Sequence, residues 1–301
     1  MKAFRIVCSL LATGPAAVLA GCGLAHAPVL DPHGPVALTE RNLLFIASGL
    51  MLLVVVPVFV MTFLFARRFR ASNAGTPHLP DWSYSARLDA VVWSVPSLIV
   101  AVIGCLLWTY THGLDPYRRS AGVIAPLMVE AIAEDWKWLF IYPEQNIAAV
   151  NELVFPSDRP LRIELTSDTV MNAFYVPGLV GQIYTMAGMR TELNLSTDGP
   201  AEFVGWNTQY SGGGFPDQRF AVRATARSQF DSWVAMAKRS PNPLDAAADA
   251  ALAKPSSKVP VTYFSAVEPH LFAGIIAKYS NSPMSNMNEP ARGAPAPSGT
   301  Q

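Results

Sequence analysis

Two long runs without a charged side chain constrain this chain of 301 residues more than any other feature. Leu43–Phe65 has 23 residues and Ala90–Tyr110 has 21. Because a helix rises about 1.5 Å per residue, each run is long enough to cross a hydrocarbon layer of about 30 Å. The sequence therefore predicts a transmembrane helical hairpin. A hairpin buried in the core of a soluble protein is the less favoured interpretation.

The loop between the two runs, residues 66–89, carries four arginines and so predicts the orientation of the hairpin. Cytoplasmic loops of membrane proteins are enriched in Lys and Arg. We therefore expect this loop on the cytoplasmic side, and the chain before and after the hairpin in the periplasm. The arginines are Arg67, Arg68, Arg70 and Arg87.

The N-terminus is typical of an export signal. Lys2 and Arg5 precede the apolar stretch Ile6–Leu19, which is too short to span a bilayer. The stretch ends in Leu-Ala-Gly-Cys, with the cysteine at Cys22, and this ending resembles the lipobox of bacterial lipoproteins. The resemblance implies that residues 1–21 are removed and that Cys22 is acylated. An ordinary secretory signal, in which Cys22 has no role, is the alternative.

Charge and cysteine content exclude several classes of function. The formal net charge is zero, and no basic block stands out beyond Arg67–Arg70, so we expect no nucleic-acid partner. Residues 113–301 contain no cysteine and one histidine, His270. This excludes a disulfide framework there. It also excludes a blue or dinuclear copper centre, because such centres need thiolate and imidazole ligands.

Residues 123–226 consist of short apolar runs separated by proline and glycine. In Leu161–Leu165 apolar and polar side chains alternate strictly, as in a strand with one buried face. Several such runs in succession predict an antiparallel sandwich or barrel. The strands expected are Leu139–Tyr142, Leu161–Thr166, Arg190–Leu195, Glu202–Trp206 and Arg219–Ala226.

The pattern changes to helical periodicity after this region. Ser228–Asp231 is interpreted as a capping box that opens a helix. The alanine-rich residues 243–254 and the amphipathic segment Glu268–Lys278 predict two further helices. Beyond Pro283 the composition is typical of a disordered tail.

Local motifs add a resemblance to a known family. Two helices followed by a β-sandwich, the segment Asp135-Trp136-Lys137-Trp138, and the strand Val170–Pro177 resemble subunit II of the haem–copper oxidases. The resemblance implies two transmembrane helices followed by an all-β cupredoxin-like sandwich with C-terminal helices. The expected parts are a signal peptide (1–21), a periplasmic segment (22–41), a hairpin (42–112), a cupredoxin-like domain (113–227), a helical extension (228–282) and a tail (283–301).

In that family, the loop matched by Gly205–Gln218 carries most ligands of a dinuclear copper site. The resemblance implies that every ligand position has been replaced in this chain and that the chain holds no metal. The remaining side chains suit a plugged, hydrogen-bonded pocket. The replaced positions are Asn172, Asn207, Gln209, Ser211, Phe215 and Gln218.

A subunit II without copper is similar to one branch, the cytochrome bo-type quinol oxidases. Trp136–Gln145, Gln182–Met189 and Tyr210–Phe215 carry this resemblance. It implies subunit II of a proton-pumping complex that oxidises ubiquinol and reduces O₂ to water in subunit I, which holds the haems and copper. The implied partners are subunits I, III and IV and the lipid bilayer of the bacterial inner membrane. The implied role of this chain is structural, with no catalytic residue of its own.

Two groups of residues and two other functions stay open at this point. Trp136 and Trp138 could form an aromatic electron relay, although core packing is favoured. Glu130, Glu134 and Asp135 could form part of a proton exit path, although a solvated face is favoured. The alternative functions are a cytochrome c oxidase subunit II with a working copper relay, and a membrane-anchored lipoprotein that acts as a binding module.

Overall fold

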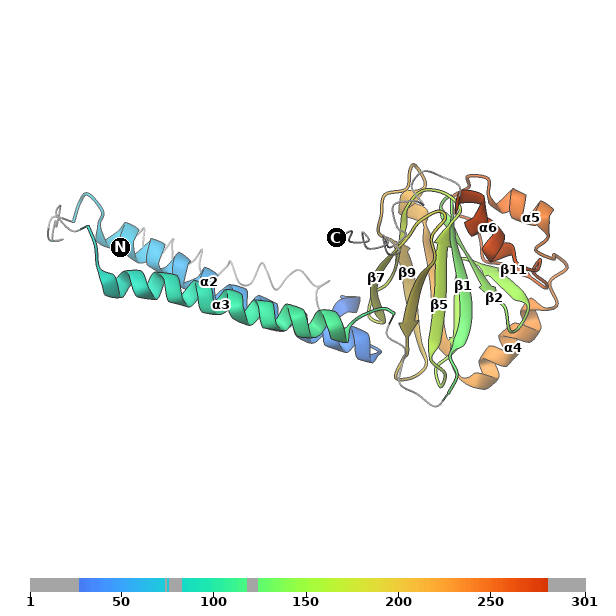
Figure 1. Ribbon diagram of the computed structural model, residues 1–301, viewed down its shortest axis with the longest axis horizontal. Helices are drawn as coiled ribbons and strands as arrows, with labels where there is room; N and C mark the ends of the chain where they lie inside the picture. Colours follow the sequence, from blue (N-terminus) through green and yellow to red (C-terminus); the bar gives the residue numbers. More distant parts are fainter. Residues whose placement is uncertain (1–26, 74, 76–82, 118–123, 281–301) are drawn as a thin grey trace, which may run out of the picture. The chain divides into compact units, whose positions relative to one another are not determined.

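The computed structural model describes residues 27–73, 75, 83–117 and 124–280 (Figure 1). The chain divides into two compact units. One consists of Thr39–Asp115, and the other of the residues up to Leu38 together with those from Pro116 onward. The signal sequence, Cys22 and the tail after Pro283 lie outside the described residues, so the expectations for them remain predictions.

Two long helices make up most of the first unit, although α2 begins four residues before it. Helix α2 spans Pro35–Arg68 and helix α3 spans Ala86–Gly113, so both extend beyond the uncharged runs. Both are long and apolar enough to cross a membrane. Most of their large apolar side chains are exposed, as with Phe59 at 72%. Such surfaces are costly in water and favourable in lipid.

The second unit is a sandwich of two β-sheets (Figure 1). Sheet A has the strand order β11-β3-β2-β1-β5-β8, and sheet B the order β4-β10-β9-β6-β7. The strands of sheet A are β1 Leu127–Glu134, β2 Lys137–Tyr142, β3 Ile147–Val150, β5 Leu161–Ser167, β8 Thr191–Leu195 and β11 Thr262–Phe264. Those of sheet B are β4 Glu152–Pro156, β6 Asn172–Val176, β7 Val180–Thr185, β9 Ala201–Asn207 and β10 Arg219–Thr225.

The expected sandwich is confirmed, but the expectation that it is antiparallel throughout was wrong. Strand β1 pairs with β5 in parallel, and β10 pairs with β4 in parallel. The reason is that the chain changes sheets between β3 and β4 and returns to sheet A with β5. A strand that returns in this way can lie beside an earlier one in the same direction, which alternation of side chains does not reveal.

Apolar side chains fill two separate layers. The larger cluster lies between the sheets and includes Trp138, Phe140, Phe174 and Phe220. The smaller cluster lies on the outer face of sheet A and includes Ile132, Leu139 and Ile141. Strand β2 is buried along its whole length because it contributes to both clusters.

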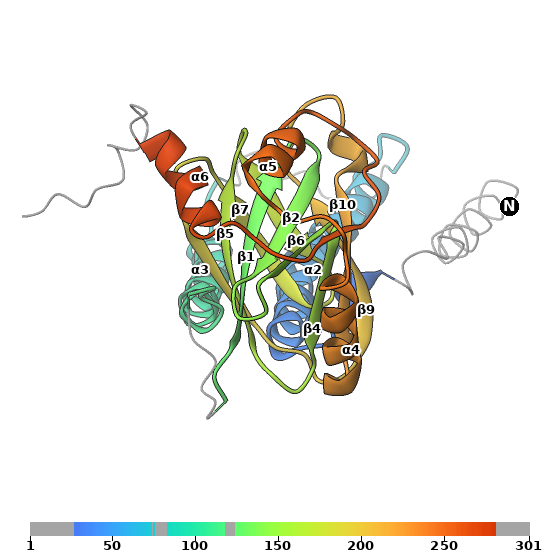
Figure 2. The ribbon, with the colours of Figure 1, turned by 90° about the vertical axis from the view of Figure 1, so that its right-hand side faces the viewer.

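Three helices come after β10 in the chain, with β11 between the second and the third: α4 Arg227–Ala237, α5 Ala246–Leu252 and α6 Leu271–Ser280. Figure 2 looks onto the side of the sandwich where α5 lies near the ends of β1 and β2 and α6 lies beside β5. Phe272 and Ile275 of α6 pack into the smaller cluster, and so does Leu244 before α5. This extension therefore supplies the apolar cover of the outer face of sheet A.

The expected helices are present with different ends. The capping-box interpretation was wrong, because Ala226 is the N-cap of α4 and Ser228 lies inside the helix. A side-chain cap does begin α5, where the Asp245 carboxylate accepts the backbone N–H groups of Ala247 and Ala248 at 3.1 and 2.8 Å. Helix α6 begins at Leu271, directly after His270, whose φ of 64° is left-handed.

Candidate functional site

The end of sheet B brings together four of the six positions singled out in the sequence. Asn172 begins β6, Asn207 ends β9, and Ser211 and Gln218 belong to the loop between β9 and β10. Strands β6 and β9 are neighbours in sheet B. Pairing of these strands therefore places residues 35 positions apart within hydrogen-bond distance.

Asn207 is the centre of a buried network of carboxamides. Its Nδ2 lies 2.7 Å from Asn172 Oδ1, 2.8 Å from Gln218 Oε1 and 3.1 Å from Ser211 Oγ. Its Oδ1 accepts the backbone N–H groups of Ala173 and Gln209. Both ends of the amide are thus engaged, although the side chain is only 5% exposed.

The other members of the network are engaged as well. Asn172 donates to the carbonyl of Val170 at 2.9 Å. The Ser211 hydroxyl donates to Gln218 Oε1 at 2.9 Å, and Gln218 Nε2 lies 3.4 Å from the carbonyl oxygen of Glu134. A closed network of this kind fixes the local geometry, because opening it would leave buried polar atoms without partners.

The two remaining positions lie outside this network. Gln209 is partly exposed and contributes its backbone N–H. Phe215 is half-buried in a short 3₁₀ helix, Phe215–Asp217, and its ring packs against Tyr210 with centroids 5.8 Å apart. The polar side chains themselves, rather than a phenyl ring, occupy the space between the strands.

The indole of Trp136 covers the loop between β9 and β10. Its Nε1 donates to the carbonyl of Ser211 at 3.0 Å. A Cβ at Gly214 would lie 2.2 Å from Trp136 Cδ2, so this position has room only for glycine. Trp136 itself has a φ of 65°, a costly conformation for a bulky residue. The ring and the loop therefore hold each other in place.

Trp138, two residues later, lies in the core between the sheets. It is fully buried, with its ring centroid 5.4 Å from that of Phe174 and 5.6 Å from that of Phe220. The two tryptophans thus belong to different surroundings, one on the loop and one in the core. Core packing, which was the favoured interpretation, describes Trp138. An aromatic relay between the two rings stays the alternative hypothesis.

The donor set of the network does not fit a copper ion. Copper centres of this fold class use thiolate and imidazole ligands. Carboxamide and hydroxyl groups occupy the matching positions here, and their oxygens already accept hydrogen bonds. Within residues 27–73, 75, 83–117 and 124–280, no group of three or more His, Cys, Asp or Glu side chains could hold a metal ion.

The acidic cluster differs from the solvated face that was favoured. Glu134 is only 2% exposed, so that interpretation was wrong for this residue. Burial, with the Asp168 carboxylate nearby, raises the pKa of Glu134 to about 8. Glu130 is half-buried, and burial with the neighbouring Glu164 raises its pKa to about 6. Asp135 accepts the Thr169 hydroxyl at 2.8 Å.

Several charged residues around Glu134 were missed in the sequence. Asp168, Asp249 and Lys278 act on its ionisation together with Lys137. They come from the end of β5, from α5, from α6 and from β2. Helical periodicity shows which side of a helix is buried but not which residues cover that side. The sequence therefore does not predict that residues of α5 and α6, more than 100 positions further along the chain, lie near Glu134.

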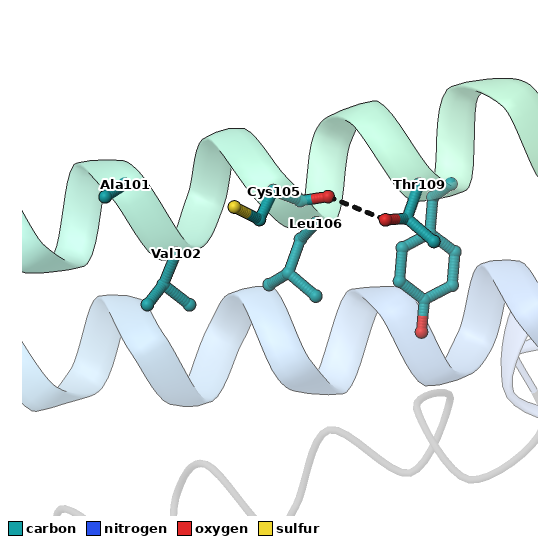
Figure 3. A pocket seen from close by; sticks show the side chains of 6 residues that line it. Ala101, Val102, Cys105, Leu106 and Thr109 are labelled. Atoms are coloured by element: carbon teal, nitrogen blue, oxygen red, sulfur yellow. Dashed lines mark hydrogen bonds between the residues drawn. The ribbon is translucent and has the colours of Figure 1, made fainter.

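Helix α3 also has a shallow hollow on its surface (Figure 3). Val102 and Leu106 point toward α2 in this view, and the Thr109 hydroxyl bonds back to the carbonyl of Cys105 at 2.9 Å. The lining is largely apolar and so suits an apolar environment. It is formed by Ala101, Val102, Cys105, Leu106, Thr109 and Tyr110.

Comparison with known proteins identifies the family. The chain is 47% identical over 271 residues to the cytochrome bo(3) ubiquinol oxidase subunit 2 of Pseudomonas aeruginosa, covering 90% of this chain and 81% of that protein. It is 48% identical to the subunit of the same name from Pseudomonas putida, covering 87% and 82%. It is 43% identical to the ubiquinol oxidase subunit 2 of Acetobacter aceti, covering 88% and 86%.

Two further comparisons concern parts of the chain. Residues 238–282 match the family model of the COX Aromatic Rich Motif. The periplasmic domain of subunit II of cytochrome oxidase from Bradyrhizobium japonicum aligns with a TM-score of 0.37 and 24% identity, covering 38% of this chain and 95% of that domain. Because these relatives are 43–48% identical and are covered over 81–86% of their length, this chain belongs to the family of ubiquinol oxidase subunit 2.

Proposed function

We propose that this chain is the membrane-anchored subunit II of a proton-pumping terminal oxidase that oxidises ubiquinol and reduces O₂ to water. Its role is to assemble and stabilise subunit I, which carries the haems and copper and performs the chemistry. Subunits III and IV complete the complex. Membership of the ubiquinol oxidase subunit 2 family supports this assignment.

The observation that carries the proposal is the carboxamide network around Asn207. Cytochrome c is soluble in water, so an oxidase that uses it needs an electron relay outside the membrane. Ubiquinol is dissolved in the membrane and can deliver electrons there directly. A sandwich whose loop carries carboxamides in place of soft metal ligands suits the second kind of enzyme.

The proposed location is the bacterial inner membrane, with the sandwich in the periplasm. Helices α2 and α3 are long and apolar enough to cross the bilayer. Arg67 and Arg68 at the end of α2 favour a cytoplasmic loop. Acylation of Cys22 would place a lipid at the periplasmic surface, where it would add to the anchorage that the helices provide.

Purification of the tagged chain from membranes in mild detergent tests the function. We expect haem-containing partners to copurify and the complex to consume oxygen with ubiquinol but not with reduced cytochrome c. We also expect no copper in the sandwich of this subunit. Consumption of oxygen with cytochrome c, or one to two copper ions bound by this subunit, would instead indicate a cytochrome c oxidase. A chain that purifies without haem would indicate a separate binding module.

Acylation has a test of its own. Cells grown with labelled palmitate should incorporate the label into the wild-type chain and not into Cys22→Ala. Cys105→Ala is the matched control and should keep the label, because Cys105 lies in α3. Equal labelling of wild type and Cys22→Ala would exclude the lipoprotein assignment while leaving the oxidase assignment intact.

A further inference from the structure

Glu134 and Lys137 are opposite charges at directly paired positions that do not bind each other. They are register partners at the adjoining ends of β1 and β2. Side chains at such positions lie on the same face of the sheet and normally interact. In this structure, however, the Lys137 ammonium is 2.9 Å from Ser256 Oγ, 3.0 Å from the Lys254 carbonyl and 3.2 Å from the Asp135 carbonyl.

Those contacts fasten the segment between α5 and β11 to the sandwich. Residues 253–261 join the two elements, and most of them are at least partly exposed. Beyond Lys137, this segment also contacts the sandwich through the Ser256 N–H to the Asp135 carbonyl at 3.4 Å and through the Asn151 amide to the Val259 carbonyl at 2.8 Å. The exposed Lys258 ammonium adds a weak ion pair with Asp217 at 4.0 Å. Lys137 therefore provides the closest attachment at residues 254–256.

Glu134 lies beside this attachment, and one oxygen of its carboxyl group makes no hydrogen bond. The side chain is 2% exposed, and Oε1 has no hydrogen-bond partner among the described residues. The charged groups that face it are Lys137 from β2, Asp168 from the end of β5, Asp249 from α5 and Lys278 from α6. Of the two cations, Lys278 is already bound to Asp168 at 2.7 Å.

We propose that Glu134 and Lys137 form a proton-controlled latch for the segment 253–261. While Glu134 is protonated, Lys137 holds residues 254–256 on the sandwich. When Glu134 releases its proton to solvent, its carboxylate draws the ammonium away, and the segment loosens. The two states differ by one proton and by the partner of one ammonium group.

Electrostatics favours a change of partner over a simple strengthening of the present contacts. A carboxylate is a stronger acceptor for an ammonium than a carbonyl or a hydroxyl oxygen is. Burial disfavours the charged form of Lys137 and lowers its pKa, so this ammonium gains from a negative partner. Burial together with Asp168 raises the pKa of Glu134 to about 8, which places the change at mildly alkaline pH.

Limited trypsin digestion of the full chain in its detergent-solubilised complex tests the latch. The reporter is the Lys258–Val259 bond, because Lys254 precedes Pro255 and resists trypsin. Its cleavage rate is divided by that of a free peptide substrate at the same pH. We expect the ratio to rise about tenfold from pH 7 to pH 9, following the ionised fraction of a group with a pKa of about 8.

Three variants separate the latch from a general effect of pH. Glu134→Gln should keep the ratio low at every pH, whereas Lys137→Met should give the high ratio already at pH 7. Glu144→Gln is the matched control, because Glu144 binds Arg159 on the surface and should leave the rise unchanged. A flat ratio in the wild type, or the same rise in Glu134→Gln, would overturn the proposal. The Glu134→Gln result decides the matter if Lys137→Met does not fold.

Discussion

At the scale of single residues, Glu134 couples the stability of the sandwich to pH. Its pKa is raised from 4.5 to about 8 in the folded chain, chiefly by burial. Between these values the unfolded chain has lost the proton that the folded chain retains. The free energy of unfolding therefore falls as pH rises from about 4.5 to about 8. The stability that the protonated Glu134 carboxyl contributes at low pH is fully lost above the folded pKa.

Glu134→Gln should remove this dependence, because the amide stays neutral in both states. We expect the variant to be more stable than the wild type by about 2–5 kcal/mol at pH 9 and to differ little at pH 4. Urea unfolding followed by tryptophan fluorescence at the two pH values measures the difference. Equal stability of the two proteins at pH 9 would show that the carboxyl group ionises without cost in the folded chain.

A second residue-scale prediction concerns the loop under Trp136. Gly214→Ala would place a Cβ 2.2 Å from Trp136 Cδ2 and force the ring or the loop to move. We expect a loss of about 1–3 kcal/mol in the free energy of unfolding. Gly213→Ala is the control, since a Cβ there meets no atom within 4 Å. The loop is looser than described if both variants melt at the wild-type temperature.

At the scale of elements, Asn151 joins three parts of the fold. It lies between β3 and β4 with a left-handed φ of 58°. Its Oδ1 accepts the backbone N–H of Trp138 in β2 at 2.9 Å, and its Nδ2 donates to Val259 of the extension at 2.8 Å. One side chain thus fixes a turn, a core strand and the C-terminal extension.

Substitutions at Asn151 should separate the hydrogen bonds from the backbone conformation. Asn151→Gly loses both bonds but tolerates the left-handed φ, so we expect a loss of about 1–3 kcal/mol in the free energy of unfolding. Asn151→Ala adds the strain of a left-handed alanine and should cost about 1 kcal/mol more. Urea unfolding of both variants shows which of the two is the more stable. If alanine is the better replacement, backbone strain does not contribute at this turn.

Elements differed in how well the sequence predicted them. Alternation in Leu161–Leu165 correctly indicated β5, because a strand with one buried face leaves its period in the sequence. The start of α4 was misplaced, because serine before a helix is common but here lies inside the first turn. The parallel pairing of β1 with β5 could not be predicted from the sequence. The relative direction of two strands in a sheet depends on the path that the chain takes between the two strands.

At the scale of the whole molecule, the extension after α4 completes the sandwich. Leu244, Phe264, Phe272 and Ile275 pack with residues on the outer face of sheet A, such as Leu139. Without them this apolar face would be open to water. The match of residues 238–282 to a family model covers almost the same stretch.

A chain that ends at residue 237 should therefore fail to form a stable sandwich. Exposing the smaller cluster removes about 1.5–3 kcal/mol of stabilisation for each large apolar side chain that becomes exposed. Added over the cluster, this loss is comparable to the free energy of unfolding of a typical domain. We expect this truncation to aggregate or to be degraded, whereas a chain that ends at residue 280 should match the full chain. Soluble, folded sandwich from the shorter chain would show that the extension contributes little to stability.

By itself, the sequence determined the two apolar helices, the all-β class of the sandwich and the absence of cysteine thiolates from residue 113 onward. These properties depend on composition and local periodicity, which are present in the chain before it folds. Only the tertiary structure decided that Asn172, Asn207 and Gln218 bind one another. It also decided that Glu134 is buried, because its cover comes from helices more than 100 residues further along the chain. Burial and charge pairing depend on residues that folding brings together, so the pKa of a group follows from the fold and not from its neighbours in sequence.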